Sequence, residues 1–500
     1  MRRLWFDTFD WRLHSAGLTL ERLTWGGTGG AQLILSNRSG RVLQTVSDRV
    51  PSGAGDAPRI GFPMDAVIPA GGVRRRLEPI VAMRALLPLL ATRARVVSFR
   101  VLDTEAKTVA RIVLETPSGK SAHLLAPPCR LQVVGLRGYD AEAARLAHQL
   151  AALPDLHQAS TSPLAAALAG VGRHPGDYSG RVDAQLTPTM SAGSAMRLLL
   201  RRLLTIADAN LPGVVADLDT EFLHDLRVAV RRARSALKLV GDTLPARDVA
   251  GLAVEMKWMG DLTTPTRDLD VYLLNLDAIA GPDAGSEELE PFLDFLLRRR
   301  QLAQRTLVAG LRSRRWSRAR RRWEAVAESS PAAAGAPAAG AIPIPVVALD
   351  RIARAYRRAV RLGALITPAA PATELHALRK RCKELRYLLE FFSSLLDPPA
   401  YRAVLDQLKA LQDCLGEFQD SQVERSAISA FAEAILAEGG APAATFMAMG
   451  RATDRLEARQ GAARKLFAAR FARFADKQTR AHLAELGPVR VSRKPPGGER

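Results

Sequence analysis

The stretch HDLRVAVRRARSALKLV, at His224–Val240, decides the fold of this chain, because a second version of it returns later. That version, HALRKRCKELRYLLEFF, occupies His376–Phe392, which is 152 residues further along (376 − 224). The same offset continues beyond the two stretches, so that Asp268 falls on Asp420. Blocks that match at one spacing are typical of an internal duplication. The sequence therefore predicts two related halves.

Each copy has the pattern of an amphipathic helix with one cationic face. At about 100° per residue, the basic residues fall within one arc of the helix and the apolar residues within the opposite arc. The cationic faces comprise His224, Arg227, Arg231 and Arg234 in the first copy, and His376, Arg379, Lys383 and Arg386 in the second. Like charges one turn apart repel each other, so we predict that the two faces line one anion-binding site. A solvated basic surface is the alternative.

Further basic residues at equivalent positions extend the predicted site. They are Lys257 with Lys409, and Arg202 with Arg354. Arginine binds two oxygens of a phosphate at once and lysine acts as a point charge, so such rows suit phosphate chains. A nearby polyanion favours the protonated, two-donor form of imidazole. We therefore predict that His224 and His376 are phosphate donors, with a structural hydrogen-bonding role as the alternative.

These stretches resemble the CHAD family of histidine-containing α-helical domains, which bind inorganic polyphosphate. The similar segments are LHDLRVAVRRARSALKL, KWMGDLTTPTRDLDV, LHALRKRCKELRYLLEF and LKALQDCLGEFQDSQV. The resemblance covers the distinctive parts of residues 190–485. It implies two four-helix bundles related by a pseudo-two-fold axis, with a basic groove between them that binds polyphosphate and is not catalytic.

Composition limits the other functions. The net charge of +20 favours a polyanionic partner, whereas aromatic residues make up only 5% of the chain, which disfavours stacking on single-stranded nucleic acid. The three cysteines, Cys129, Cys382 and Cys414, lack metal-site spacing and fit a reducing compartment. No run of about 18 apolar residues predicts a membrane span. No secretory signal is evident, so we expect a cytoplasmic protein, with polyphosphate granules as a location to test.

The first part of the chain has a β pattern. Short apolar segments such as Ala31–Leu35, Val96–Leu102 and Thr108–Leu114 are separated by turn residues. WFDTFDWRLHSAGLTLERL, at Trp5–Leu23, is similar to the second-strand region of the CYTH family of triphosphate-tunnel barrels, and Leu131–Leu150 resembles the end of that module. The resemblance implies a partial antiparallel β-barrel over residues 1–155.

One feature of the CYTH enzymes is missing. In that family an earlier strand carries the ExExK carboxylates that hold a divalent metal, but here Met1 comes shortly before the WFDTFD element. We therefore expect a degenerate module without triphosphatase activity and predict no metal site or cofactor. A metal-dependent CYTH-type triphosphatase remains the alternative, and an upstream start of the chain would favour it.

The predicted organisation is α+β and multidomain. A CYTH-like β module spans residues 1–155, a linker 156–189, the CHAD domain 190–485 and a disordered basic tail 486–500. Within the CHAD domain, repeat one spans 190–328 and repeat two 346–485, with the Ala/Pro/Gly-rich stretch 329–345 as a flexible linker between them.

Helix breaks and an acidic block are predicted inside both repeats. We expect a turn at Pro265 between helices at Val249–Met259 and Asp268–Ile279, and an equivalent turn at Gly416. Asp268 and Asp270 are predicted to cap the helix that they begin and to bind arginines of the neighbouring turn. A metal-binding pair is the alternative, although the second copy has Asp420 and Gln422 at these positions.

The predicted function is polyphosphate binding through a basic groove between the duplicated bundles, for targeting or scaffolding at polyphosphate. No helix suited to reading base edges in a DNA groove is evident, so specific nucleic-acid binding is not predicted. General polyanion or nucleic-acid binding remains an alternative. The sequence does not predict the oligomeric state.

Overall fold

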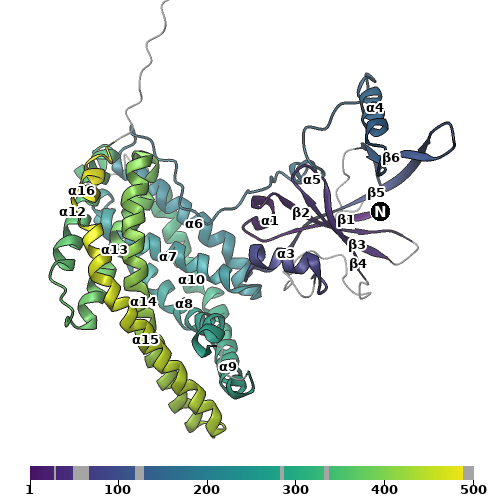
Figure 1. Cartoon of the computed structure of the whole chain (residues 1–500). Coiled ribbons are helices and arrows are strands. Elements are labelled where there is room, and N and C mark those ends of the chain that lie inside the picture. The colour runs from purple at the N-terminus through teal and green to yellow at the C-terminus, as the bar shows by residue number, and fades with distance from the viewer. Residues whose placement is uncertain (27–29, 49–66, 119–128, 282–285, 331–336, 488–500) are drawn as a thin grey trace, which may run out of the picture. The chain divides into compact units, whose positions relative to one another are not determined.

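The computed structural model describes residues 1–26, 30–48, 67–118, 129–281, 286–330 and 337–487 (Figure 1). The chain divides into two compact units. The first contains residues 1–180 and 218–221, and the second contains residues 181–217 and 222–500. In the described part of the chain, no helix has both the length and the apolar character needed to cross a membrane.

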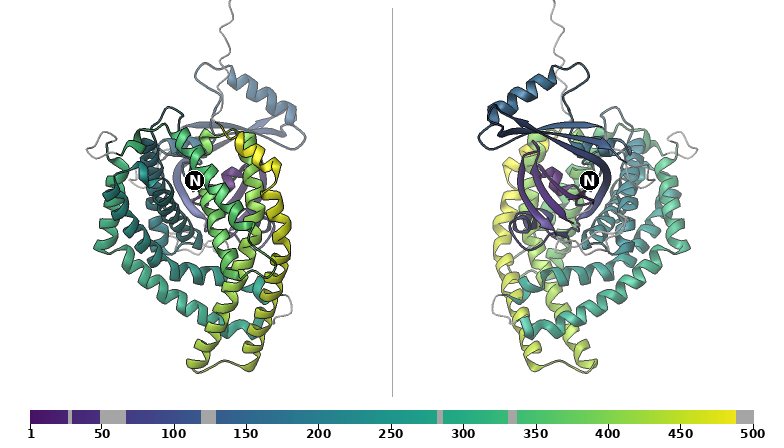
Figure 2. Two further views of the ribbon diagram at one scale, coloured as in Figure 1. Left: turned by 90° about the vertical axis from the view of Figure 1, so that its left-hand side faces the viewer. Right: turned by 90° about the vertical axis from the view of Figure 1, so that its right-hand side faces the viewer.

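The first unit contains a curled antiparallel sheet. Its described strands are β1 (Arg2–Asp7), β2 (Leu18–Thr24), β3 (Ala31–Asn37), β4 (Val42–Asp48), β5 (Leu87–Leu102), β6 (Thr108–Pro117) and β7 (Arg130–Gly135). They lie in the order β4-β3-β2-β1-β5-β6-β7, and Figure 2 shows how the sheet curls. The predicted partial antiparallel barrel is confirmed, and the WFDTFD element begins in its central strand, β1, which ends at Asp7.

Short helices cover this sheet. They are α1 (Arg12–Ser15), α3 (Gly72–Val81), α4 (Asp140–Ala151) and α5 (Pro163–Ala169). Alternate residues of β1 point to opposite faces, and Phe6 packs with Leu13 of α1 and Leu77 of α3. Trp5 packs instead with Leu164 and Leu168 of α5. The predicted linker 156–189 therefore contains a helix that belongs to the core of the first unit, because its leucines bury apolar area there.

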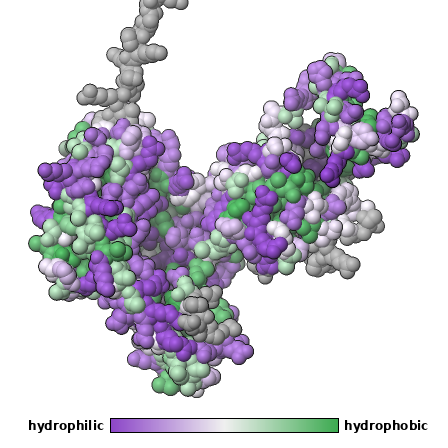
Figure 3. All heavy atoms as spheres, in the orientation of Figure 1, coloured by the Kyte–Doolittle hydropathy of each residue, from purple (hydrophilic) through white to green (hydrophobic). Residues whose placement is uncertain are grey.

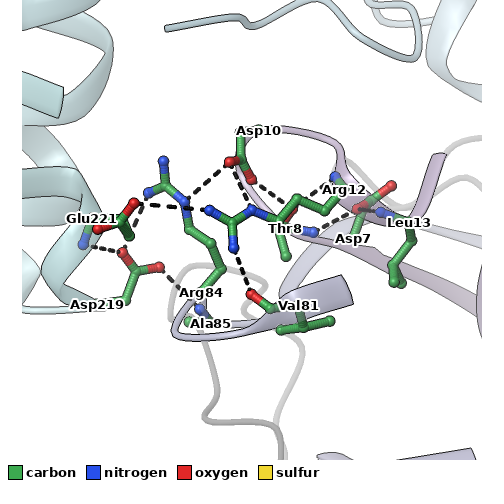
Figure 4. A network of polar contacts seen from close by, with 10 residues as sticks. All are labelled: Asp7, Thr8, Asp10, Arg12, Leu13, Val81, Arg84, Ala85, Asp219 and Glu221. Carbon is green, nitrogen blue, oxygen red and sulfur yellow. Dashed lines mark hydrogen bonds and ion pairs between the residues drawn. The ribbon is translucent and has the colours of Figure 1, made fainter. Parts of the chain in front are cut away.

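Asp7 organises the turn that follows β1. Its buried carboxylate accepts hydrogen bonds from the backbone N–H groups of Thr8 and Leu13, at 2.7 and 2.9 Å (Figure 4). It also accepts one from the His14 N–H at 2.9 Å. Burial raises the pKa of Asp7 to about 6, although the three donors favour its charged form. The carboxylate thus satisfies backbone donors of α1 that lack helical partners.

Arg84 extends this polar network within the first unit. Its side chain is only 1% exposed and forms ion pairs with Asp10 and Asp219, at 3.4 and 3.3 Å. The Ala85 N–H also donates to Asp219, and Arg12 donates to Asp10 at 2.9 Å (Figure 4). Because buried arginine is stable only when it is paired, two carboxylates are required at this position.

The second unit is helical and repeats itself at the offset found in the sequence. Its described elements are α6 (Ala192–Ala216), α7 (Thr220–Val240), η1 (Gly241–Thr243), α8 (Ala246–Ala280), α9 (Ser286–Leu311), α10 (Arg314–Glu328), α11 (Ala338–Ala341), α12 (Ile344–Gly363), α13 (Ala372–Phe391), η2 (Ser393–Leu395), α14 (Pro398–Ala437), α15 (Ala443–Phe474) and α16 (Lys477–Ala484). Helices α6 and α12, the turns η1 and η2, and helices α8 and α14 each begin 152 residues apart. Figure 2 shows the teal helices of the first repeat and the green and yellow helices of the second.

A short backbone bridge shows how the repeats are related. The Ala192 N–H donates to the Ile342 carbonyl at 2.8 Å, and the Ile344 N–H donates to the Met190 carbonyl at 2.9 Å. At the offset of 152, Ala192 corresponds to Ile344 and Met190 corresponds to Ile342. The two donors are therefore equivalent, and so are the two acceptors, so the duplication converts one bond into the other. This is the arrangement of two repeats around a pseudo-two-fold axis. Within the predicted linker 329–345, residues 331–336 lie outside the described residues, as do residues 488–500 of the predicted tail.

Two predicted helix breaks are wrong. Helix α8 continues through Pro265, and α14 continues through Gly416. Proline removes one helical N–H donor and leaves the carbonyl four residues earlier without its helical partner, but the apolar packing of α8 beyond Pro265 outweighs this loss. Glycine costs a helix interior only about 1 kcal/mol relative to alanine, which tertiary packing of a 40-residue helix overcomes.

The unbroken helices have a structural consequence. Their C-terminal halves meet in one apolar cluster that combines both repeats: Leu276 and Ile279 of α8, Phe292, Phe295 and Leu296 of α9, Ile428 and Ile435 of α14, and Met449 and Leu456 of α15. A turn at Pro265 or Gly416 would remove these residues from the cluster. The two bundles therefore share a core at this end of the helical unit.

The Asp7 network makes a testable prediction. We expect Asp7→Ala to leave three N–H donors without an acceptor, which costs several times the roughly 1–3 kcal/mol of one unsatisfied buried group before relaxation. Hydrogen–deuterium exchange should accelerate over residues 8–15 and remain unchanged over residues 222–484. Asp103→Ala, which removes a similar acceptor from the exposed β5–β6 turn, is the control. Equal effects of the two substitutions on residues 8–15 would contradict the role given to Asp7.

Candidate anion-binding site

Helices α7 and α13 lie antiparallel along a seam of ion pairs. Arg232 of α7 binds Glu390 of α13 at 2.6 Å, and Lys238 binds Glu384 at 2.6 Å. As the residue number rises along α7, that of its partner falls along α13, which fixes the antiparallel direction. Glu390 also accepts from Arg386 at 2.7 Å, so each oxygen of this carboxylate has an arginine donor.

The seam depends on a difference between the repeats. Adding the offset of 152 turns 232 into 384 and 238 into 390, so the two ion pairs exchange under the pseudo-two-fold relation. Had the second copy kept the cations of the first, Arg232 and Lys238 would each face a like charge. Glutamates at 384 and 390 convert that repulsion into attraction.

A group of cations that is only partly compensated by carboxylates lies beside the seam. Burial, together with the nearby charges of Arg379, Arg231 and Arg386, lowers the pKa of Lys383 to about 8, and Asp420 opposes this shift. We call Arg231, Arg379, Lys383 and Arg386 the central cationic cluster. Arg231 and Lys383 are equivalent residues of the two repeats, and their charges interact across the seam. In the part of the chain that the structure describes, neither forms an ion pair or a hydrogen bond.

The arginines one turn earlier are held within their own repeats. Arg227 donates to the hydroxyls of Thr263 and Thr264 on α8, both at 2.9 Å, and burial lowers its pKa. Its equivalent, Arg379, binds Asp420 of α14 at 2.9 Å. Both arginines therefore attach the cationic helix to the next long helix, which limits the number of donors they can offer to a ligand.

The acidic block differs from the prediction in one respect. Asp268, Asp270 and Asp420 lie in the interior of α8 and α14 and cap no helix. Asp270 and Asp420 do bind arginines, but from other helices: Asp270 pairs with Arg300 of α9 at 2.9 Å, and Asp420 with Arg379 of α13. The difference follows from the missing breaks, because a continuous helix has no start at these residues. Among the described residues, no cluster of three or more His, Cys, Asp or Glu side chains could hold a metal ion.

The two histidines lie at the edge of the site. The Nδ1 of His376 lies 2.9 Å from the Gln419 side-chain oxygen, so the ring donates to that amide and presents its other nitrogen elsewhere. His224, its equivalent, is half-buried on α7 and also has interaction partners in the structure. Both positions combine a structural contact with proximity to the cationic faces.

The remaining predicted residues are not brought into the central cationic cluster. Lys257 pairs with Asp261 at 2.7 Å on the exposed side of α8, and the charge of Arg234 also acts on Asp261. Lys409 is exposed on α14. Arg202 donates to the Arg181 carbonyl at 3.2 Å, and Arg354 pairs with Asp350 at 2.8 Å. Of the twelve predicted residues, the structure thus brings together mainly the four of the central cationic cluster, which lie beside the seam between α7 and α13.

The sequence reasoning missed a second group of cations on α12. Arg357, Arg358 and Arg361 are exposed on this helix, together with Arg354. Their spacing of three and four residues is that of one helical face, and this signal was present in the sequence. It was not used because these three arginines have no basic counterpart in the first repeat.

Comparison with known proteins identifies the helical region. The family model of the CHAD domain matches residues 198–429. Two curated relatives from Mycobacterium tuberculosis, uncharacterized protein Rv2226 of strain ATCC 25618 / H37Rv and uncharacterized protein MT2285 of strain CDC 1551 / Oshkosh, are 29% and 28% identical over 209 residues. The match spans 41% of this chain and only 39% of each relative.

Two solved structures are also similar. The CHAD domain from the plant Ricinus communis has 24% identity and a TM-score of 0.45, and the match covers 62% of this chain and 97% of that one. PptA from Streptomyces chartreusis has 21% identity and a TM-score of 0.42, with coverage of 57% and 99%.

The seam between α7 and α13 makes a prediction about stability. Glu390 and Arg232 have side chains that are both 17% exposed, so Glu390→Gln should leave two arginines without their carboxylate. We expect a loss of about 1.5–3 kcal/mol in the free energy of unfolding, measured by urea denaturation and far-UV circular dichroism. Glu374→Gln removes an exposed carboxylate from the same helix and should change stability by less than about 0.5 kcal/mol. Equal losses in the two variants would contradict the importance of the seam.

Proposed function

Because residues 198–429 form a CHAD domain, we propose that this protein binds inorganic polyphosphate at the central cationic cluster. The observation that carries the proposal is the pair Arg231 and Lys383. At the neighbouring positions 384 and 390 the second repeat has carboxylates, which neutralise the cations Lys238 and Arg232 of the first repeat. At 231 and 383 both repeats have a cation; burial lowers the pKa of Lys383, and repulsion from Arg379 and Arg231 lowers it further. A bound anion relieves this repulsion.

The symmetry of the site also favours an inorganic phosphate chain. Linear polyphosphate has no direction, since both of its ends are alike, and it carries a charge on every unit. A pair of equivalent cations across a pseudo-two-fold axis binds such a chain equally well in either direction. Arginine supplies bidentate contacts, and Lys383 supplies a point charge. Polyphosphate binding would allow the protein to act in targeting or scaffolding at polyphosphate.

We propose further that the first unit is a degenerate CYTH-like module without triphosphatase activity. Two glutamates of its sheet, Glu21 of β2 and Glu115 of β6, both bind the Arg3 guanidinium, at 3.1 and 2.8 Å. A divalent cation is held by carboxylates whose charge is available to it, and here the charge of both glutamates is directed to arginine. The alternative is a metal-dependent triphosphatase.

The charge state of Lys383 predicts how polyphosphate binding depends on pH. Lys383 must be protonated to bind phosphate, and its pKa in the free protein is about 8. Affinity for long-chain polyphosphate should therefore fall as the pH rises from 7 to 9.5, when measured by isothermal titration calorimetry at constant ionic strength. Lys383→Arg keeps the charge over this range and should remove most of the pH dependence. An unchanged pH profile in Lys383→Arg would contradict the assignment of Lys383.

The same assay tests the location of the site. Loss of one charge-assisted contact costs about 1.5–3 kcal/mol, or roughly 10- to 100-fold in affinity, so Arg231→Gln with Lys383→Gln should weaken binding by at least that factor. Arg305→Gln with Lys465→Gln removes the same charge from exposed positions and should have a much smaller effect. Equal effects would indicate a general basic surface. Duplex DNA that competes as well as polyphosphate, at matched phosphate concentration, would indicate non-specific polyanion binding.

The first unit makes a separate prediction. Purified protein should release no phosphate from tripolyphosphate or ATP above a blank, with either magnesium or manganese, because Arg3 occupies both glutamates. Phosphate release that depends on added metal, and that is lost in Glu21→Gln, would show that the unit is an enzyme.

A further inference from the structure

A second basic surface lies on the second repeat. Helices α12, α13 and α14 line an open groove of about 1000 Å³, which we call the α12 groove, and its residues include Arg358, Arg361, Leu362, Leu365, His376 and Lys380. A hollow of about 570 Å³ adjoins it, the arginine hollow, lined by Arg354, Arg357, Arg358, Arg361 and Arg480. Arg358 and Arg361 line both, so the two form one continuous depression. Figure 3 shows how hydrophilic and hydrophobic residues alternate over one face of the helical unit.

Four of the cations that line this depression have no protein counter-charge. In the described part of the chain, Arg357, Arg358, Arg361 and Lys380 take part in no ion pair or hydrogen bond. Other charged residues nearby are neutralised: Glu384 binds both Lys238 and Arg381, at 2.6 and 2.8 Å. Three unpaired arginines within one turn of α12 repel each other, and an anion with several charges is the ligand that they favour.

Most cations of the depression are not duplicated, although His376 and Arg354, which also line it, have basic equivalents in the first repeat. At the offset of 152, Arg357, Arg358 and Arg361 correspond to Thr205, Ile206 and Ala209, and Lys380 corresponds to Val228. The first repeat thus has no charge at any of these positions. The central cationic cluster, in contrast, has a cation in both repeats. Arg357, Arg358 and Arg361 therefore form a basic surface that belongs to the second repeat alone and requires its own explanation.

Apolar residues distinguish the ligand of this depression from a bare phosphate chain. Leu365 is 69% exposed in the α12 groove, beside Leu362, Ala372 and Ala377. The side-chain amides of Gln419 and Gln422 line the same groove and offer neutral donors and acceptors. Inorganic polyphosphate would contact the cations and leave the leucines in water. A phosphorylated organic molecule would use both parts, and the volume of the groove suits a small ligand.

We propose that the second repeat carries a separate site for a phosphorylated organic anion of the nucleoside triphosphate class. The phosphates bind Arg357, Arg358 and Arg361 in the arginine hollow, where guanidinium groups donate two hydrogen bonds each. The organic part lies in the α12 groove against Leu362 and Leu365. No covalent step is involved. The site is independent of polyphosphate binding at the central cationic cluster, so that each can fail without the other.

The test measures binding of ATP and of inorganic tripolyphosphate to the full chain by calorimetry, without divalent metal. Both probes carry three phosphates, but only ATP has an organic part. We expect ATP to bind more tightly. Arg358→Gln with Arg361→Gln should weaken ATP binding by at least about 10-fold. Leu365→Ser should weaken ATP binding several-fold and leave tripolyphosphate binding unchanged, which a merely unfolded or less basic variant would not do.

Two variants serve as controls. Arg231→Gln with Lys383→Gln removes two charges from the central cationic cluster and should leave ATP affinity within about three-fold of the parent, and Arg305→Gln with Lys465→Gln should do the same. Equal affinity for ATP and tripolyphosphate, with no effect of Leu365→Ser, would overturn the proposal in favour of a plain anion surface. Loss of ATP binding in the central variant, but not in Arg358→Gln with Arg361→Gln, would overturn it in favour of a single site. Neither result would contradict the proposal that polyphosphate binds at the central cationic cluster.

Discussion

The helical unit depends on the charge pairing between α7 and α13. A duplicated helix that packs antiparallel against its own copy meets that copy in reversed order, so that position 232 faces 390 and position 238 faces 384. An unmodified basic helix would therefore place a cation against a cation at both pairs. This chain has Arg232 and Lys238 in one copy and Glu384 and Glu390 at the corresponding positions of the other. The exchange converts two repulsive contacts into two ion pairs and fixes the register of the two helices. At the adjacent positions, Arg231 and Lys383 remain alike in charge; burial lowers the pKa of Lys383, and the charges of Arg379 and Arg231 lower it further. The same arrangement therefore stabilises the repeat pair and leaves one place where an anion is needed.

The rest of the helical unit positions this seam. Backbone hydrogen bonds between residues 190–192 and 342–344 join the repeats at one end. The apolar cluster of α8, α9, α14 and α15 joins them at the other. Because both contacts combine residues of the two repeats, neither bundle is complete alone. The arginines Arg227 and Arg379, which bind α8 and α14 respectively, connect the cationic helices to these long helices and so hold the central cationic cluster in place.

Whereas the partial barrel was predicted from the resemblance to the CYTH family, the sequence predicted the duplication and the cationic helices because each has a periodicity that can be read along the chain. It failed at Pro265 and Gly416, where local helix-breaking residues are outweighed by tertiary packing that no local pattern reveals. The sequence also predicted the same anion-binding role for Arg227 and Arg231, since both lie on one helical face. The structure separates them through Thr263 and Thr264, which bind Arg227 alone. Arg357, Arg358 and Arg361 of α12 were not predicted as a site, because the prediction was based on cations that occur in both repeats. These three arginines occur in the second repeat only.

The central claim is that a phosphate chain lies between two equivalent cations of the two repeats. A crystal structure of the protein with bound long-chain polyphosphate tests it most directly, through difference density for phosphate groups at the central cationic cluster. The account predicts phosphate oxygens within hydrogen-bonding distance of both Arg231 and Lys383, with the ion pairs of Arg232 and Lys238 intact. Phosphate density confined to the arginines of α12, or to one repeat only, would contradict it.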